Sequence, residues 1–237
     1  MKLMSCRSIC ILLMISSSSA EAGGLPGWIE AEVNAGVGTL RGYAADASVT
    51  VSPWSPIYES GPKFRFTAAQ SVYTFRDIPA DPTLSKERDT ALDLLVGYAY
   101  QADWWSLLGL VGPTALQSVF FPVESPFSET TTKLGTRAVV VLDANPTDQT
   151  MVFAQGNYST INSAYLVEAK FGAAALPKVF IGPEVSFSHG LNYEQRRVGA
   201  FIFGPVGSLL AEISIGYVND PNQGAGAYLR TSVATTF

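Results

Sequence analysis

Hydrophobic residues recur at every second position along most of this chain, and this alternation limits the fold more than any other feature. In the segment 42–51, for example, Tyr43 and Val49 fall on one face of an extended chain, and Asp46 and Ser48 fall on the other. Such a pattern predicts β-strands with one apolar and one polar face. About twelve such strands are predicted: 28–37, 42–51, 63–75, 89–101, 104–117, 136–142, 151–159, 164–172, 179–188, 195–203, 209–217 and 227–237.

The balance of apolar residues favours a membrane-spanning barrel over a soluble one. Hydrophobic residues make up 47% of the chain, yet no run approaches the ~18 consecutive apolar residues of a membrane helix. The predicted strands have about 9–11 residues, as tilted membrane-spanning strands do. Backbone groups in lipid must be bonded internally, so such strands have to close on themselves. We therefore predict an all-β fold, a single antiparallel transmembrane β-barrel of about 12 strands (10–14). The alternative is a soluble sandwich or lipocalin-like barrel with the two faces inverted.

The N-terminal segment predicts export. Lys2 and Arg7 give a positive start, 9–15 is apolar, and 20–22 reads Ala-Glu-Ala. This is the pattern of a cleaved secretory signal peptide, so we assign 1–22 to the signal and 23–237 to the barrel domain of a bacterial outer-membrane protein.

Composition excludes several classes of chemistry. Both cysteines, Cys6 and Cys10, lie within the predicted signal, so the mature chain is expected to have no disulfide, thiolate metal site or cysteine nucleophile. A net charge of −5 argues against nucleic acid as a partner, because nucleic-acid binding needs basic patches. We expect outer-membrane lipid as a partner and no cofactor.

The segment 227–237 has the character of a barrel-closing strand. Leu229, Val233 and Phe237 share one face, while Tyr228 and Arg230 share the other. A terminal aromatic such as Phe237 suits the membrane interface. Short periplasmic turns are predicted at 102–103, 144–148, 176–178 and 204–207, and longer outward loops at 76–88 and 119–132. The stretch 53–62 is long for a periplasmic turn, and the pattern does not explain it.

The polar faces of the predicted strands place acids and bases together in the lumen. They are Glu30, Glu32, Asp46, Asp93, Glu168, Glu184, Glu212, Arg65, Arg137, Lys170, Arg197 and Arg230. An unpaired buried charge is costly, so a paired network is expected. Adjacent strands joined by a tight hairpin predict an ion pair between Glu184 and Arg197. The alternative is a path or a sugar-contacting patch, for which the candidate residues are Glu184, Gln195, Arg197, Glu212, Tyr228 and Arg230.

Catalytic and metal motifs do not stand out. The single histidine, His189, follows Ser188, but neighbouring strand residues point to opposite faces, which disfavours a triad built from them. We predict no catalytic or metal-binding residue. The tryptophans are predicted interface anchors, with contact to polysaccharide as the alternative for Trp54 and the pair 120–121.

Several short segments resemble one known family. They are 97–98, 144–147, 157–159, 181–185, 195–200, 215–217, 227–228 and Phe237. The chain resembles the BcsS family of cellulose biosynthesis proteins through these segments. The resemblance implies an outer-membrane barrel associated with bacterial cellulose production and export, with the glucan chain and other cellulose-synthesis components as partners. It brings no catalytic residues with it.

The functional hypothesis from sequence is a non-enzymatic accessory barrel that assists export or surface anchoring of the glucan. Two alternatives remain open. One is an outer-membrane barrel enzyme acting on lipid or polysaccharide, and the other is a soluble periplasmic ligand-binding barrel.

Overall fold

A computed structural model describes residues 27–39, 42–75, 85–121, 128–191, 193–221 and 224–237. The predicted signal peptide, with Cys6 and Cys10, lies outside the described residues. Within the described part of the chain no helix is long and apolar enough to span a membrane.

Twelve strands and one short 3₁₀ turn make up the described fold. They are β1 (Ile29–Gly38), β2 (Gly42–Val51), β3 (Gly61–Phe75), β4 (Ser85–Gln101), β5 (Trp105–Phe121), β6 (Glu129–Thr147), β7 (Thr150–Ser159), η1 (Ile161–Ser163), β8 (Tyr165–Leu176), β9 (Val179–Gly190), β10 (Tyr193–Val206), β11 (Leu209–Asp220) and β12 (Gly224–Thr236).

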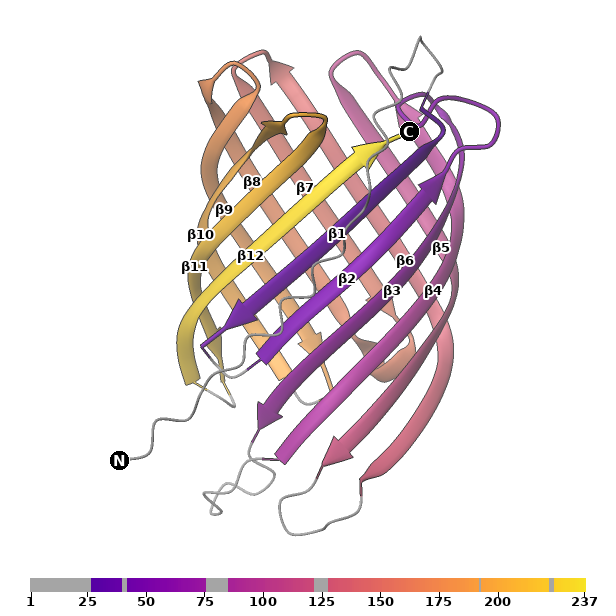
Figure 1. Cartoon of the computed structure of the whole chain (residues 1–237), viewed down its shortest axis with the longest axis vertical. Helices are drawn as coiled ribbons and strands as arrows, with labels where there is room; N and C mark the ends of the chain where they lie inside the picture. Colours follow the sequence, from indigo (N-terminus) through magenta and orange to yellow (C-terminus); the bar gives the residue numbers. More distant parts are fainter. Residues whose placement is uncertain (1–26, 40–41, 76–84, 122–127, 192, 222–223) are drawn as a thin grey trace.

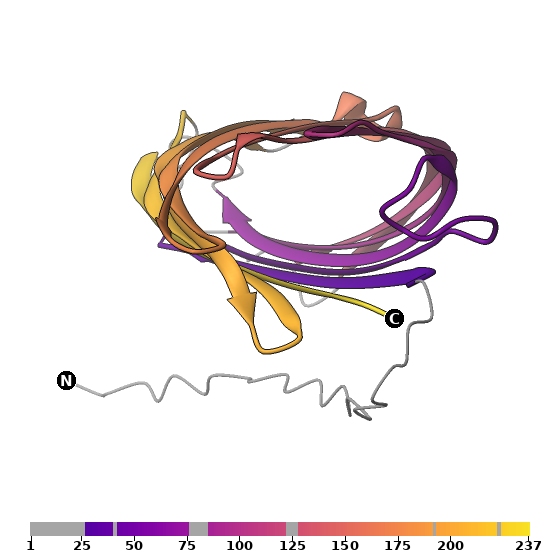
Figure 2. The same ribbon diagram turned by 90° about the horizontal axis from the view of Figure 1, so that it is seen from above.

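The strands form one closed antiparallel barrel in chain order (Figure 1). Viewed along its axis the barrel is an oval ring, with β1 and β12 side by side (Figure 2). These two strands pair from Glu30 opposite Thr236 to Gly38 opposite Tyr228. Closure leaves no sheet edge exposed, which is what lipid requires of a β-structure. The predicted fold class is confirmed.

The outer surface of the barrel is apolar. Large hydrophobic side chains point outward from every strand, and on β4 the exposed fraction of Leu94 is 60%. Their neighbours in sequence, such as Asp93 and Leu95, are 2% exposed. The two faces of the alternation therefore lie as the sequence predicts, with the apolar face outside. The inverted, soluble arrangement would have placed these hydrophobic side chains in a core.

The two ends of the barrel differ. At the end where β1 begins and β12 finishes, which we call the terminal end, the hairpins are closed by short turns such as 148–149 and 177–178. At the opposite end, the far end, β3 to β6 extend beyond the other strands (Figure 1). These four strands have 15, 17, 17 and 19 residues.

The long strands correct part of the sequence prediction. Residues 85–88, 119–121 and 129–132, predicted as outward loops, belong to β4, β5 and β6. Hairpin pairing continues beyond the apolar band because threonine-rich strand ends such as 130–132 favour extended backbone even where both faces are polar. The predicted turn 144–148 is also mostly strand, because β6 runs to Thr147 with a register shift after Ala144.

The unexplained stretch 53–62 is an ordered connection at the terminal end. The Lys63 ammonium, only 2% exposed, donates hydrogen bonds to the Ser52 hydroxyl at 2.7 Å, the Glu59 carbonyl at 3.0 Å and the Pro56 carbonyl at 3.2 Å. The Ile57 amide donates to the Gly27 carbonyl at 2.7 Å. A buried ammonium needs such partners, so Lys63 ties this connection to the barrel rim.

All four tryptophans lie at the terminal end. Trp28, Trp54 and Trp104 are 48%, 70% and 54% exposed, and the Trp104 ring packs edge-on against Trp105 with centroids 6.4 Å apart. The Trp54 ring lies 5.9 Å from that of the outward-facing Phe64. This position suits interface anchors, and the anchoring role stays a prediction.

Candidate functional site in the barrel lumen

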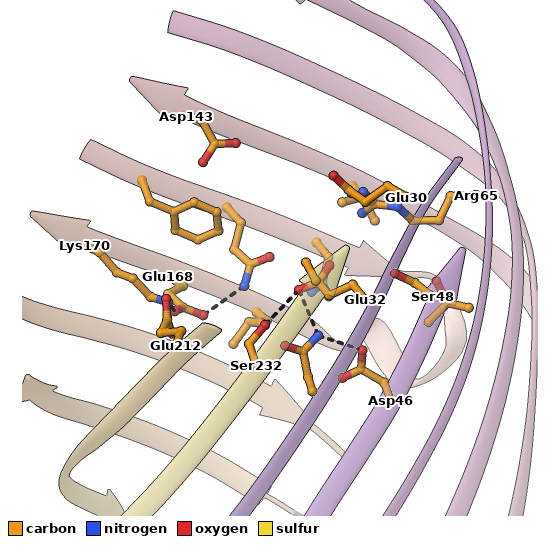
Figure 3. A pocket seen from close by; sticks show the side chains of 18 of the residues that line it. Glu30, Glu32, Asp46, Ser48, Arg65, Asp143, Glu168, Lys170, Glu212 and Ser232 are labelled. Carbon is orange, nitrogen blue, oxygen red and sulfur yellow. Dashed lines mark hydrogen bonds and ion pairs between the residues drawn. The ribbon is translucent and has the colours of Figure 1, made fainter. Parts of the chain in front are cut away.

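The lumen contains a polar cavity of about 620 Å³ near the terminal end (Figure 3). This volume lies within the ~300–1,000 Å³ of typical ligand sites. Seven carboxylate and four cationic side chains line the cavity. They come from the polar faces of strands on all sides of the barrel, because inward and outward residues alternate along each strand.

Five charged side chains of the lumen form a compact network, which we call the charge cluster, and all of them except Glu184 line the cavity. Its members are Glu168 and Lys170 on β8, Glu184 on β9, Glu212 on β11 and Arg230 on β12. Arg230 donates to Glu168, with Nη1 2.7 Å from Oε2, and lies 3.1 Å from Glu184 and 3.4 Å from Glu212. Lys170 pairs with Glu212 and lies 3.0 Å from Glu168.

Burial makes the charge cluster cohesive. Glu168 and Glu184 are 1% and 5% exposed. Buried charges of opposite sign are retained only when each is paired and hydrogen-bonded. Gln155 adds a hydrogen bond to Glu168 at 2.9 Å, and the Lys170 ammonium lies over the Phe153 ring, 5.1 Å from its centroid. The charge cluster therefore joins strands β8, β9, β11 and β12 from the inside.

Tyr228 connects β12 to β9 across two glycines. Its hydroxyl donates to Glu184 at 2.5 Å, although β10 and β11 lie between the two strands. The paired positions on those strands are Gly199 and Gly216. A Cβ at Gly199 would lie 2.3 Å from the Tyr228 hydroxyl, and one at Gly216 would lie 2.8 Å from its ring. Because glycine has no side chain, these two positions leave space for the Tyr228 side chain.

The predicted direct pairing of Glu184 with Arg197 is wrong. Glu184 lies opposite Gly199, and Arg197 lies opposite Ser186. Within the described ranges, the cations paired with Glu184 are Arg230 and Lys170. Arg197 instead donates to Gln195 at 2.6 Å and lies over the Tyr228 ring, 5.5 Å from its centroid. The two residues are linked through Tyr228, because glycine at 199 lets that side chain lie between them.

Four other carboxylates of the same cavity form what we call the acidic wall: Glu30, Glu32, Asp46 and Asp143. Figure 3 shows Glu30, Glu32 and Asp46 on one side of the cavity and Asp143 apart from them, on the side of Lys170. Among the residues that the structure describes, no lysine or arginine forms an ion pair with these four. Asn34 donates to Glu32 at 3.1 Å and to Asp46 at 3.0 Å, which holds two like charges side by side.

A second, smaller cavity of about 200 Å³ lies toward the far end of the barrel. Gln195, Arg197 and Tyr228 line it together with Tyr73 and Asp89. The Tyr73 hydroxyl donates to Asp89 at 2.9 Å. Arg230 lines both cavities, so the charge cluster stands where they meet. All six lumen candidates from the sequence lie at or beside this junction: Glu184, Gln195, Arg197, Glu212, Tyr228 and Arg230.

Two other sequence candidates lie away from the lumen. His189 is outside, opposite Tyr165 in the neighbouring strand, and the two rings stack with centroids 5.5 Å apart. Phe237 is 59% exposed, and its amide donates to the Ile29 carbonyl at 2.8 Å, so it extends the pairing of β12 with β1. Within the described ranges, histidine, cysteine and carboxylate groups do not gather into a metal-binding cluster.

A comparison with known protein families finds one family that the chain matches. The sequence model of the family described as cellulose biosynthesis protein BcsS matches residues 35–237. The chain belongs to the BcsS family. The match extends from β1 through β12 and therefore covers nearly the whole barrel. No curated protein matches the chain.

Solved structures similar to this BcsS-family barrel come from outer-membrane proteins. The translocator domain of the autotransporter NalP from Neisseria meningitidis is 12% identical over 92% of this chain and 90% of that domain, with a TM-score of 0.54. The β-domain of the Bordetella autotransporter BrkA is 11% identical over 90% of this chain and all of that domain, with a TM-score of 0.52. At this identity the likeness is one of fold.

Three residues that line the two cavities of this BcsS-family barrel are not predicted from the sequence. Asp143 was not recognised because the predicted strand ended at Leu142, whereas β6 continues to Thr147 and turns Asp143 into the cavity. Tyr73 and Asp89 lie where the predicted strands meet a predicted loop. The signal that could have found them is the alternation itself, carried a few residues further along β3, β4 and β6.

Proposed function

We propose that this BcsS-family barrel lies in the bacterial outer membrane as a non-enzymatic accessory of cellulose biosynthesis that holds the glucan and assists its export or surface anchoring. The observation that carries the proposal is the family match over residues 35–237. The apolar outer surface and the polar lumen support it, because a glucan crossing or held in a membrane needs hydrogen-bonding groups around it.

Holding or anchoring fits the lumen better than free passage through a wide pore. The charge cluster stands between the two cavities, with Arg230 reaching both. A barrel of twelve strands lies between the filled interior of eight and the aqueous channel of sixteen. A glucan that entered from either end would meet the charge cluster.

The test of the proposed function is a deletion strain scored for cellulose at the cell surface and in the periplasm. We expect surface cellulose to fall and to recover when the wild-type gene is restored. Normal cellulose in both places would overturn the proposal. Fractionation adds a second measurement, in which the barrel is expected in the outer membrane with a heat-modifiable band on gels. Recovery in the soluble periplasm would contradict the location.

The non-enzymatic part of the proposal has its own test. His189 faces away from the lumen against Tyr165, and this supports a structural role for the ring. We expect His189→Ala to leave cellulose output unchanged in the complemented strain. Loss of output with a normally assembled barrel would favour the alternative of an enzyme acting on lipid or polysaccharide.

A further inference from the structure

One ion pair in the larger cavity leaves hydrogen-bonding capacity unused. Arg137 Nη1 lies 2.6 Å from Asp93 Oδ2, while Asp93 Oδ1 and Arg137 Nε, both buried, have no hydrogen-bond partner among the described residues. Asp93 is 2% exposed, and both side chains line the cavity. A buried polar atom without a partner is costly. Because both atoms are covered, a ligand in the cavity meets Asp93 and Arg137 as an ion pair and adds no hydrogen bond to these two atoms.

The acidic wall offers acceptors in excess of donors. An ionised carboxylate only accepts hydrogen bonds, and Glu30, Glu32, Asp46 and Asp143 together receive few from the protein. Lys170 and Arg230 belong to the charge cluster. Arg65 lies beside Glu30 (Figure 3) and donates its Nε–H to the Thr50 hydroxyl at 2.9 Å. A ligand of this cavity must therefore supply donors.

The net charge of the cavity sets a second requirement for its ligand. Seven carboxylates face four cations around the cavity, which is an excess of three acids. Like charges brought together in a site of low dielectric repel strongly. A carboxylated sugar would add negative charge beside the acidic wall, whereas an amino sugar would bring both hydrogen-bond donors and positive charge.

We propose that this cavity selects its glycan by charge, binding amine-bearing β-1,4-glycans most tightly, neutral ones next and uronic-acid polymers least. This selection rests on the proposed function, since it defines the class of glycan for the same lumen. The selecting residues are Glu30, Glu32 and Asp46.

The experiment is calorimetric titration of the purified barrel in a detergent without a sugar headgroup. The three probes share one β-1,4-linked backbone: cellohexaose, the hexamer of glucosamine with its amines protonated, and the hexamer of glucuronic acid. We expect the glucosamine hexamer to bind about tenfold more tightly than cellohexaose and the glucuronate hexamer to bind at least about tenfold more weakly. The spread should shrink as salt is added, because exposed charges are screened.

A variant of the acidic wall and a matched control test which residues select the glycan by charge. The triple variant Glu30→Gln, Glu32→Gln and Asp46→Asn removes three charges from the acidic wall. The control, Asp103→Asn, Glu129→Gln and Asp148→Asn, removes three exposed charges outside the cavity. We expect the first variant to lose the order of affinities and the control to keep it. A heat-modifiable band checks that each variant is folded.

The outcomes separate the two proposals. Binding of cellohexaose without discrimination among the three hexamers would overturn the charge selection and leave the proposed function standing. Binding of the glucosamine hexamer alone, together with normal cellulose in the deletion strain, would support the selection and overturn the cellulose role. An unchanged order of affinities in the acidic-wall variant would overturn the assignment of the selecting residues.

Discussion

The charge cluster and the acidic wall are built from the same residue types and have opposite surroundings. Glu168, Glu184 and Glu212 share two cations and lie among strands whose glycines let long side chains meet. The four carboxylates of the acidic wall share none within the described ranges. A buried network stabilises only when it is fully paired. The difference teaches that the same residue types can tie strands together in one part of the lumen and line a cavity without ion pairs in another.

The largest expected effect comes from Arg230→Met. This change leaves three buried carboxylates with Lys170 as their remaining cation in the charge cluster, so the free energy of unfolding should fall by about 3–5 kcal/mol. The measurement is urea unfolding of the barrel in lipid vesicles, followed by tryptophan fluorescence.

The matched control is Arg196→Met, which removes an exposed arginine paired with Glu194 at 2.7 Å. Exposed pairs contribute about 0–1 kcal/mol. Equal effects of Arg230→Met and Arg196→Met would show that the charge cluster does not hold the strands together.

The next effect concerns Gly199, one of the two glycines that the Tyr228 side chain crosses. Gly199→Ala puts a Cβ 2.5 Å from the Ile215 carbonyl oxygen and 2.3 Å from the Tyr228 hydroxyl, so backbone and tyrosine must both shift. Overpacking of this kind costs about 1–3 kcal/mol in the free energy of unfolding, measured by the same urea titration. Gly109→Ala, where the new Cβ meets nothing within 4 Å, is the control. A loss of stability as large in Gly109→Ala would point to a general effect of strand glycines.

A smaller loss is expected from Tyr228→Phe. The ring stays beneath Arg197, but the hydrogen bond to Glu184 at 2.5 Å is removed. Glu184 keeps the Ser214 hydroxyl at 2.9 Å, so the free energy of unfolding should fall by about 1–2 kcal/mol. Double-mutant analysis with Glu184→Gln checks the assignment, because the two changes should be non-additive. Simple additivity would mean that the hydroxyl does not act through Glu184.

The smallest effect is expected on the acidic wall. Asp46→Asn removes a charge that lies beside Glu32 across Asn34, so the free energy of unfolding should change by no more than about 0.5 kcal/mol or rise slightly. The same titration measures it. A loss as large as that of Arg230→Met would remove the distinction between the two regions.

The sequence predicts the fold well because alternation is a local property. The choice of face for residues such as Leu94 and Asp93 follows from the pleat of one strand, without knowledge of its neighbours. The far ends of the long strands are less visible in the sequence, because 129–133 has polar residues on both faces and looks like a loop. The connection held by Lys63 depends on carbonyl groups, which no side-chain pattern records.

The ion-pair and hydrogen-bond partners of Glu184 could not be predicted from a single pair of adjacent strands. Glu184 finds Arg230 and Tyr228 on a strand three places away, and adjacency along the chain favours Arg197. The contact depends on the relative heights of four strands and on the glycines between them. Gly199 and Gly216, both on the inward face, are the sequence signal that a side chain could lie across them.

The pairing of β1 with β12 also sets an order of events in time. Glu30 and Thr236 are about 200 residues apart, and contacts so distant along the chain form late, whereas each hairpin of neighbouring strands can form early. Until β1 pairs with β12, each of the two strands presents a row of unsatisfied backbone groups. The nascent barrel is therefore most vulnerable to wrong partners at these two strands, and a protective factor acting during assembly would have to shield them.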